Sequence, residues 1–350
     1  MDKPLGHLMQ AEIAEQTGIA LRWAESGGYL DESLRAHLQE RPPTALLTFA
    51  RGTSENAAAY GRYLSAQFVS WGSLKTDISQ ASVLDQWPRI PGSLAIGISQ
   101  SGQSPDLVAV AKGYRKRGVP ILGIVNDITS PLAGECDHVT YLAAGAEKAV
   151  AATKSFLAQC LALLDLVDVL GDEHVQRSSI SDAIARMCAQ ERAAETEEVA
   201  GVIRNSLAQH TDLVMTTRGP DYSIAREGAL KIMETCATPV PVFTTTDLEH
   251  GPVAVIGPQT PVLVLVPGGP FRSTVLAAAQ KLQKRTNRLI TVGDGTVSGS
   301  FAHIPIQEDE PHALSLSLAI WLQRLTLTLS TSMGLDPDAP PGLEKVTRTV

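Results

Sequence analysis

Two hydroxyl-rich segments in the first half of the chain have the composition of a phosphate-binding site. Arg51-Gly52-Thr53-Ser54 follows the apolar run ALLTF (45–49), and Ser99-Gln100-Ser101-Gly102-Gln103-Ser104 overlaps the end of SLAIGIS (93–99). In the second segment Ser104 suits a helix N-cap and Pro105 the first helical position. Backbone N–H groups at a helix start, several hydroxyl donors and a glycine together favour phosphate binding. The structural alternative is an ordinary serine-rich turn with a helix cap.

Ionisable side chains that could move a proton lie in the second half. Within the helical segment 223–236, Glu227, Lys231 and Glu234 are spaced to share one helix face. Taken alone, this spacing fits a solvated stripe of salt bridges as well as it fits a catalytic acid–base group.

Two further residues could take part in the chemistry. His250 lies in a short polar turn that ends at Gly251-Pro252, and Lys345 lies in a proline-rich tail. A lone histidine in a polar turn is commonly just exposed, and a short polar tail commonly frays. Neither His250 nor Lys345 alone therefore indicates a catalytic site.

The sequence predicts neither a metal nor a redox cofactor. The segment 293–298 resembles a dinucleotide loop only loosely, because it lacks the third glycine and an acidic ribose partner at the expected distance. No Walker loop is present. The four cysteines, Cys136, Cys160, Cys188 and Cys236, are far apart, which favours reduced, buried thiols over a metal site.

Composition excludes several classes of protein. With 350 residues, 44% apolar and 19% charged, the chain is long enough for two globular domains. A net charge of −8 argues against nucleic-acid or anionic-membrane surfaces, although a locally positive pocket stays possible. The N-terminus shows no apolar core of signal-peptide length, and no uncharged apolar run is long enough for a membrane span. We therefore expect a cytoplasmic protein.

Short apolar runs alternate with helix-like segments, and the pattern occurs twice. Matching segments begin at 47 and 214, at 94 and 262, and at 119 and 287, so three strand–loop–helix units recur at nearly constant separation. Strands alternating with helices predict parallel sheets covered on both faces. We predict an α/β fold with two tandem, doubly wound, flavodoxin-like domains. Because ligands in such sheets bind at the carboxyl ends of strands, both hydroxyl-rich loops are expected at one edge.

The expected boundaries follow from this repeat. They are an N-terminal helical segment (1–34), a first domain with the phosphate loops (35–171), linking helices (172–205), a second domain with Glu234 and His250 (206–332), and a tail with Lys345 (333–350).

Taken together, these motifs resemble a known family. The chain is similar, over nearly its whole length, to the double-SIS-domain isomerase half of glucosamine-6-phosphate synthase and to type II glucosamine-6-phosphate deaminases. The motifs that match are Gly52-Thr53-Ser54, Ser99-Gln100-Ser101-Gly102, Val150-Ala151-Ala152-Thr153-Lys154, Lys231 with Glu234, His250, and Lys345.

The resemblance implies a role for each matched position. It places the sugar phosphate on Gly52, Thr53, Ser54, Ser99, Gln100, Ser101 and Ser104, and the sugar near Val150, Ala152 and Glu344. It implies Glu234 as the base that moves a proton between C2 and C1, His250 in ring opening, and Lys231 and Lys345 beside the developing oxygen charge. It further implies a homodimer in which His250 completes the partner's site.

Departures from the family pattern bear on the substrate. Arg51, Ala152, Met233 and Glu344 stand where the synthase has cysteine, serine, lysine and alanine. The chain leaves no room for the synthase's N-terminal glutaminase, so the deaminating direction is expected.

Three alternatives stay open: a fructosamine-6-phosphate deglycase, a plain aldose–ketose isomerase, and a sugar-phosphate-sensing module of a transcription regulator. For the last, the N-terminal segment is too short to hold a helix-turn-helix domain.

Overall fold

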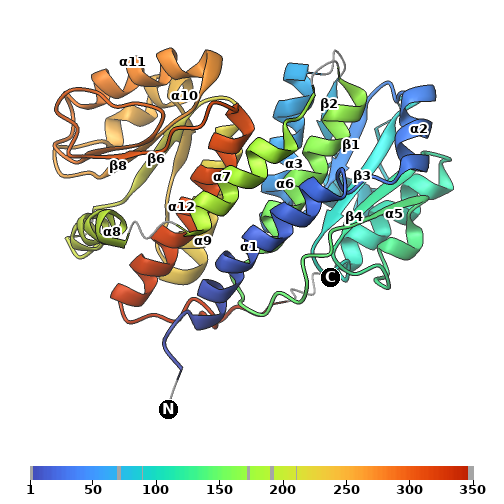
Figure 1. Ribbon diagram of the computed structural model, residues 1–350, viewed down its shortest axis with the longest axis horizontal. Coiled ribbons are helices and arrows are strands. Elements are labelled where there is room, and N and C mark those ends of the chain that lie inside the picture. The colour runs from blue at the N-terminus through green and yellow to red at the C-terminus, as the bar shows by residue number, and fades with distance from the viewer. Residues whose placement is uncertain are drawn as a thin grey trace. The chain divides into compact units, whose positions relative to one another are not determined.

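The computed structural model (Figure 1) describes residues 3–68, 72–88, 90–171, 174–189, 193–209 and 211–345. Within these residues the chain forms two five-stranded parallel sheets. The chain also divides into two compact units. Unit 1 comprises Met1–Gly18, Lys148–Thr153 and Ser178–Leu343, and unit 2 comprises Ile19–Glu147, Lys154–Arg177 and Glu344–Val350.

The sheet of unit 2 is flavodoxin-like. Its strands are β1 (Leu46–Phe49), β2 (Ser73–Lys75), β3 (Leu94–Ser99), β4 (Ile121–Val125) and β5 (His138–Tyr141). They lie in the order β2-β1-β3-β4-β5, and every pairing is parallel, as in Leu46 opposite Leu94. The strand order reverses between β1 and β3, so ligands are expected at the carboxyl ends of these two strands.

Helices cover this sheet on both faces. They are α2 (Glu32–Glu40), α3 (Gly52–Phe68), α4 (Ile78–Leu84), α5 (Pro105–Lys116), the short η1 (Ala133–Glu135) and α6 (Lys154–Leu170). Alternate strand residues such as Leu47, Phe49 and Ala95 share a buried core with Leu107 and Tyr114 of α5. Helices α3 and α6 pack against each other and against the strands. Because both faces are covered, β1, β3 and β4 are buried along their whole length.

The sheet of unit 1 repeats the same order. Its strands are β6 (Val214–Thr217), β7 (Val242–Thr244), β8 (Val262–Val266), β9 (Leu289–Gly293) and β10 (Ala302–Pro305), arranged β7-β6-β8-β9-β10 and all parallel. The prediction of two tandem doubly wound α/β domains is therefore confirmed.

The helices of unit 1 include the longest one in the described part of the chain. They are α7 (Arg177–Ala189), α8 (Ala193–Leu207), α9 (Asp221–Cys236), α10 (Thr245–Glu249), α11 (Arg272–Leu282) and α12 (Pro311–Ser332), with the short η2 (Pro252–Val255) and η3 (Gly269–Phe271). Helix α1 (His7–Glu25) begins in unit 1 and ends in unit 2. Helix α12 packs on α9 and α8, and α11 lies along the outside of its sheet in Figure 1.

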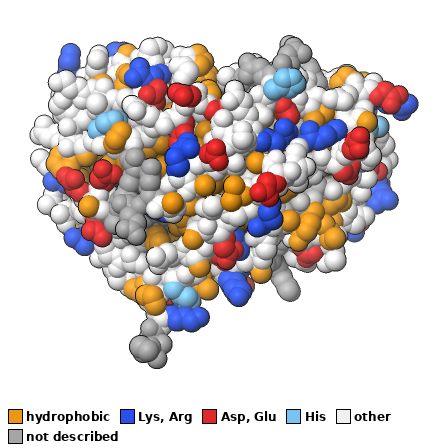
Figure 2. Space-filling view, viewed as in Figure 1, with side chains coloured by type: hydrophobic (Ala, Val, Ile, Leu, Met, Phe, Trp, Pro, Cys, Tyr) orange, Lys and Arg blue, Asp and Glu red, His pale blue; other side chains and the backbone are white. Residues whose placement is uncertain are grey.

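Helix α12 qualifies the expectation about membranes. By length and composition alone it could cross a bilayer, but 83% of its most apolar window is buried inside the protein. That burial is what a core helix of a parallel-sheet unit shows. On the face shown in Figure 2, Lys and Arg side chains are interspersed with Asp and Glu side chains.

Candidate functional site

Two helices begin at the switch point of the unit 2 sheet. Helix α3 starts at Gly52 directly after β1, and α5 starts at Pro105 after the loop that follows β3. Gly52 has a φ of +52°, a left-handed conformation that favours glycine. Both helices direct the N–H groups of their first turn and the positive end of their dipoles toward the carboxyl edge of the sheet. This edge is therefore suited to an anion.

The loop after β3 is closed by its own serine. The Gly102 N–H donates to Ser99 Oγ over 2.9 Å, and Ser99 is buried. Gly102 has a φ of +62°, and a Cβ there would lie 2.2 Å from Ser130 Oγ, so only glycine fits. The Gln103 N–H makes a longer contact of 3.3 Å to Ser101 Oγ. Ser99 thus shapes the loop, while Ser101 and Gln100 stay partly exposed.

Ser104 differs from the expectation that its side chain caps α5. It occupies the N-cap position with extended backbone angles, but its side chain makes no capping hydrogen bond. The Leu107 N–H, which an N-cap hydroxyl could accept, donates instead to Asp106 Oδ1 over 2.8 Å. The Ser104 hydroxyl is therefore not used by the helix it precedes.

The residues beside Gly52 differ in their burial and in the groups that they contact. Ser54 is buried, and its Oγ accepts a hydrogen bond from Gln159 Nε2 over 2.9 Å. Thr53 is half-buried. Arg51 reaches across to the start of α5, where its Nη2 lies 2.6 Å from Asp106 Oδ2. This ion pair joins the two loops, and the Arg51 guanidinium stays about half-exposed at 48%.

A hollow of about 430 Å³ opens beside the first of these loops. Its walls include Arg51, Gly52 and Lys75, together with Glu55 and Asp77. Glu55 is paired with Arg62 at 2.7 Å and with Lys75 at 3.1 Å. The hollow is polar and accessible, as a site for a phosphorylated small molecule would be.

The acid–base cluster on α9 is buried rather than solvated. Lys231 Nζ lies 2.6 Å from Glu234 Oε2 and 3.6 Å from Glu227 Oε1, and the lysine side chain is only 1% exposed. The alternative of a solvated stripe is therefore wrong, because a buried ammonium group needs paired carboxylates. Glu234 keeps 26% of its side chain accessible, against 4% for Glu227. Among these three residues, Glu234 is the one that a substrate can reach.

His250 lies at the end of α10. Thr244 caps this helix through the Asp247 N–H, and the His250 N–H donates to Asp247 O over 3.1 Å. Gly251 has a φ of +136°, so the chain must turn away there. The imidazole is exposed. It can exchange protons with a substrate or with another chain.

The tail lysine is anchored by a residue that the sequence did not single out. Lys345 Nζ donates to Glu147 Oε2 over 3.0 Å, and the Glu147 side chain is completely buried. The same carboxylate accepts from Ser155 N at 3.0 Å and Ser155 Oγ at 2.7 Å. No motif marks Glu147. Its only signal is its place just before the segment 150–154.

The remaining predicted residues belong to both units. Glu344 is exposed and lies with Lys345 in unit 2, while Val150 and Ala152 are half-buried in unit 1. The Val150 N–H donates to Asp338 O over 3.1 Å. Within the described ranges, no group of three or more His, Cys, Asp or Glu residues could hold a metal ion.

Known proteins share this architecture. The family model for the SIS domain matches residues 42–167 and 206–331. Glutamine–fructose-6-phosphate aminotransferase from Pyrococcus horikoshii is 31% identical over 97% of this chain and 57% of its own length. The chain thus spans little more than half of that relative.

Solved structures agree with this match. The C-terminal domain of glucosamine-fructose-6-phosphate aminotransferase from Francisella tularensis superimposes with a TM-score of 0.79 at 25% identity, covering 95% of this chain and 98% of that one. Glucosamine-6-phosphate deaminase from Thermotoga maritima shares the fold, with a TM-score of 0.76 at 21% identity over 98% and 100% of the two chains. The resemblance inferred from the motifs is confirmed.

Proposed function

The chain belongs to the SIS-domain family, and on that premise we propose that it is a phosphosugar isomerase that deaminates glucosamine-6-phosphate to fructose-6-phosphate and ammonia. The observation that carries the proposal is the pair of loops at the switch point of unit 2. Two helix N-termini, the Ser101 and Ser104 hydroxyls and the Arg51 guanidinium gather there. Such a set of donors is suited to a phosphate dianion.

In the proposed reaction the phosphate is bound by Ser99, Gln100, Ser101, Ser104 and Thr53. The pyranose ring opens by transfer of a proton from O1 to O5, for which the exposed His250 is suited because an imidazole can both donate and accept a proton.

The isomerisation itself is a proton shift. Glu234 takes the proton from C2 of the open-chain aldehyde and delivers it to C1, through an enolamine. Lys345 stabilises the negative charge that develops on oxygen. The buried Lys231 acts through its ion pair with Glu234, which holds that carboxylate in position. The C2 imine then adds water and releases ammonia, which leaves fructose-6-phosphate. The nitrogen leaves as ammonia in its original oxidation state, so the reaction needs no oxidant or reductant.

The partners and location follow from the same proposal. We propose a cytoplasmic homodimer in which the exposed His250 of one subunit serves the site of the other.

A plain aldose–ketose isomerase and a fructosamine-6-phosphate deglycase would use the same proton shift, so the substrate distinguishes them.

A substrate panel tests the proposal. The purified chain would be incubated with glucosamine-6-phosphate, glucosamine, glucose-6-phosphate and a fructosamine-6-phosphate, with ammonia and fructose-6-phosphate measured by coupled assays. We expect equal amounts of both products from glucosamine-6-phosphate and almost none from unphosphorylated glucosamine. Ketose formation from glucose-6-phosphate alone would replace the deaminase with the plain isomerase, and turnover of the fructosamine alone would favour the deglycase.

A further inference from the structure

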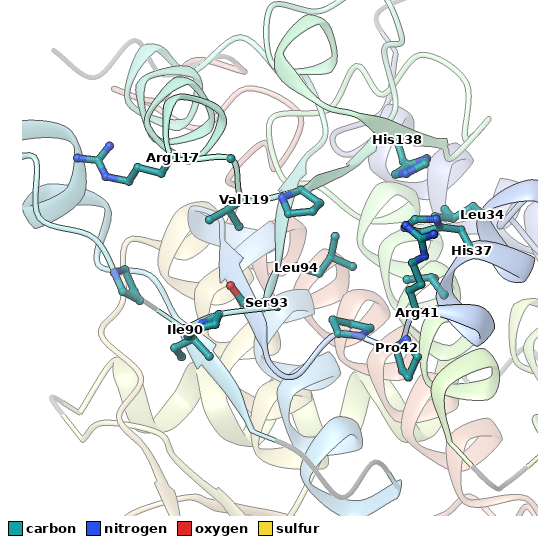
Figure 3. A pocket seen from close by; sticks show the side chains of 17 residues that line it. Leu34, His37, Arg41, Pro42, Ile90, Ser93, Leu94, Arg117, Val119 and His138 are labelled. Carbon is teal, nitrogen blue, oxygen red and sulfur yellow. The ribbon is translucent and has the colours of Figure 1, made fainter.

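A second cavity lies away from the loops discussed above. It encloses about 740 Å³ within unit 2, a size typical of sites for small organic ligands. Its walls come from residues that precede β1, β3 and β4 and from the start of β5 (Figure 3). It therefore opens at the amino ends of the strands, at the opposite edge of the sheet from Ser99 and Ser104. The proposed deamination makes no use of it.

One wall of the cavity carries an arginine and two histidines. His37, Arg41 and His138 lie together in Figure 3, and the two imidazole rings are 5.5 Å apart. The Arg41 guanidinium has only a 3.9 Å contact to Glu40, with both side chains 75% exposed. Among the described lining residues none carries a carboxylate. Arg117 contributes less, because it is already paired with Asp85 at 2.9 Å. The charge of this wall is complementary to an anion.

The rest of the lining is apolar and stiff. Ile90, Leu94 and Val119 line it together with five prolines. The prolines are Pro42, Pro43, Pro88, Pro91 and Pro120. Proline rings and branched side chains lose little freedom when a ligand packs on them. Such walls favour a flat apolar body.

A buried hydroxyl supplies an independent indication of a ligand. Ser93 is 3% exposed, and its Oγ has no hydrogen-bond partner among the described residues. Figure 3 shows this oxygen directed into the space framed by Ile90, Leu94 and Val119. Buried hydroxyls are nearly always paired, so a polar atom of a ligand would complete this one.

We propose that this cavity is a second ligand site, for a small organic anion with a flat, apolar ring system. Its acidic group contacts Arg41, His37 and His138, its rings pack on the prolines, and a polar atom meets Ser93 Oγ. The proposal does not depend on the deaminase reaction, because no residue of this cavity belongs to the proposed catalytic or phosphate-binding groups.

The test uses two fluorescent probes that differ in charge. 8-Anilinonaphthalene-1-sulfonate has fused rings and a sulfonate, and N-phenyl-1-naphthylamine is its uncharged counterpart. Both would be titrated into the full chain and into Arg41→Ala, Ile90→Trp and the control Arg22→Ala, which removes an exposed arginine from α1 outside the cavity. Circular dichroism would verify that each variant is folded.

We expect the sulfonate to bind with one-to-one stoichiometry. Arg41→Ala should weaken sulfonate binding about tenfold, the effect of one charge-assisted contact, and change binding of the amine less than about twofold. Ile90→Trp should weaken both probes by filling the cavity, and Arg22→Ala should change neither. If Arg41→Ala leaves sulfonate affinity unchanged, or weakens both probes equally, the anion site is overturned. Should Ile90→Trp fail to fold, the comparison of the two probes on Arg41→Ala decides alone.

Discussion

At the scale of single residues, the two serines of the loop after β3 have separate tasks. Ser99 is buried and accepts the Gly102 N–H, so it shapes the loop. Ser101 is partly exposed and holds only the 3.3 Å contact from Gln103 N. Ser101 is therefore the more accessible of the two hydroxyls for a phosphate.

Replacing Ser101 should affect binding and leave the fold intact. Ser101→Ala removes one charge-assisted hydrogen bond, worth about 1.5–3 kcal/mol, so KM for glucosamine-6-phosphate should rise about 10- to 100-fold with a smaller change in kcat. Steady-state kinetics would measure this, with Ser33→Ala on α2 as the matched control. An unchanged KM would remove Ser101 from the phosphate site.

Lys345 and Glu147 form a pair whose roles can be separated. We expect Lys345→Met to lower kcat about 10²-fold, as loss of a group that stabilises developing charge does. Glu147 acts through Lys345, so Glu147→Gln should also lower kcat, and the double variant should be no worse than Lys345→Met. Glu135→Gln, a surface carboxylate of unit 2, is the control. Additive losses would show that Glu147 acts independently of the lysine.

At the scale of helices and strands, much could be predicted because the period of apolar residues is a local property. The apolar segment 154–170 predicts a helix, and α6 has these bounds; the apolar runs at 45–49 and 93–99 contain β1 and β3. The sequence after Arg51 predicts a helix from about Glu55 to Trp71. The helix instead begins at Gly52, so its first turn includes the Gly52-Thr53-Ser54 segment; Trp71 lies outside the described residues. Helix starts depend on backbone angles that residue types only suggest.

Other features could not be predicted because they depend on tertiary contacts. The spacing of Glu227, Lys231 and Glu234 fixes a shared helix face, but whether that face is buried depends on what packs on α9. In the same way, Lys345 meets Glu147 across nearly two hundred residues of chain. Sequence spacing along one helix carries no information about such a partner.

Burial also changes the pKa of Asp221, in the first turn of α9. Burial of the Asp221 side chain raises its pKa to about 6, although Ser315 donates a hydrogen bond to it. An unfolded aspartate titrates near pH 4, so the free energy of unfolding falls as the pH rises from about 4 to about 6, by up to about 3 kcal/mol. Ionised Asp221 is thus unfavourable at neutral pH.

Removing that carboxylate should stabilise the fold. Relative to the native chain, Asp221→Asn should raise the free energy of unfolding by less than about 1 kcal/mol at pH 4 and by about 3 kcal/mol at pH 8. Urea unfolding at several pH values would measure the difference, with the exposed Asp182→Asn as control. A difference that does not grow with pH would contradict a raised pKa.

At the scale of the whole molecule, the proposed dimer makes each active site dependent on two chains. In a mixture of Glu234→Gln and His250→Ala dimers, subunit exchange creates heterodimers with one site that holds both residues. Each parent should be nearly inactive, and the heterodimer should recover up to about half of the native activity if its sites are independent. Absence of recovery, with exchange verified by mass spectrometry, would mean that His250 serves its own chain.

Isotope labelling at C2 would show whether Glu234 moves the proton of that carbon. Glucosamine-6-phosphate deuterated at C2 would be incubated in ordinary water with the native chain, with Glu234→Gln, and with Glu197→Gln, an exposed carboxylate on α8. NMR would follow the disappearance of deuterium from C2, whether it moves to C1 or exchanges with water. The native chain and the control should lose it rapidly, and Glu234→Gln should be slower by about 10²- to 10⁴-fold, since it keeps the shape but not the base. If Glu234→Gln retains more than about a tenth of the native rate, Glu234 is only the ion-pair partner of Lys231 and does not move the proton.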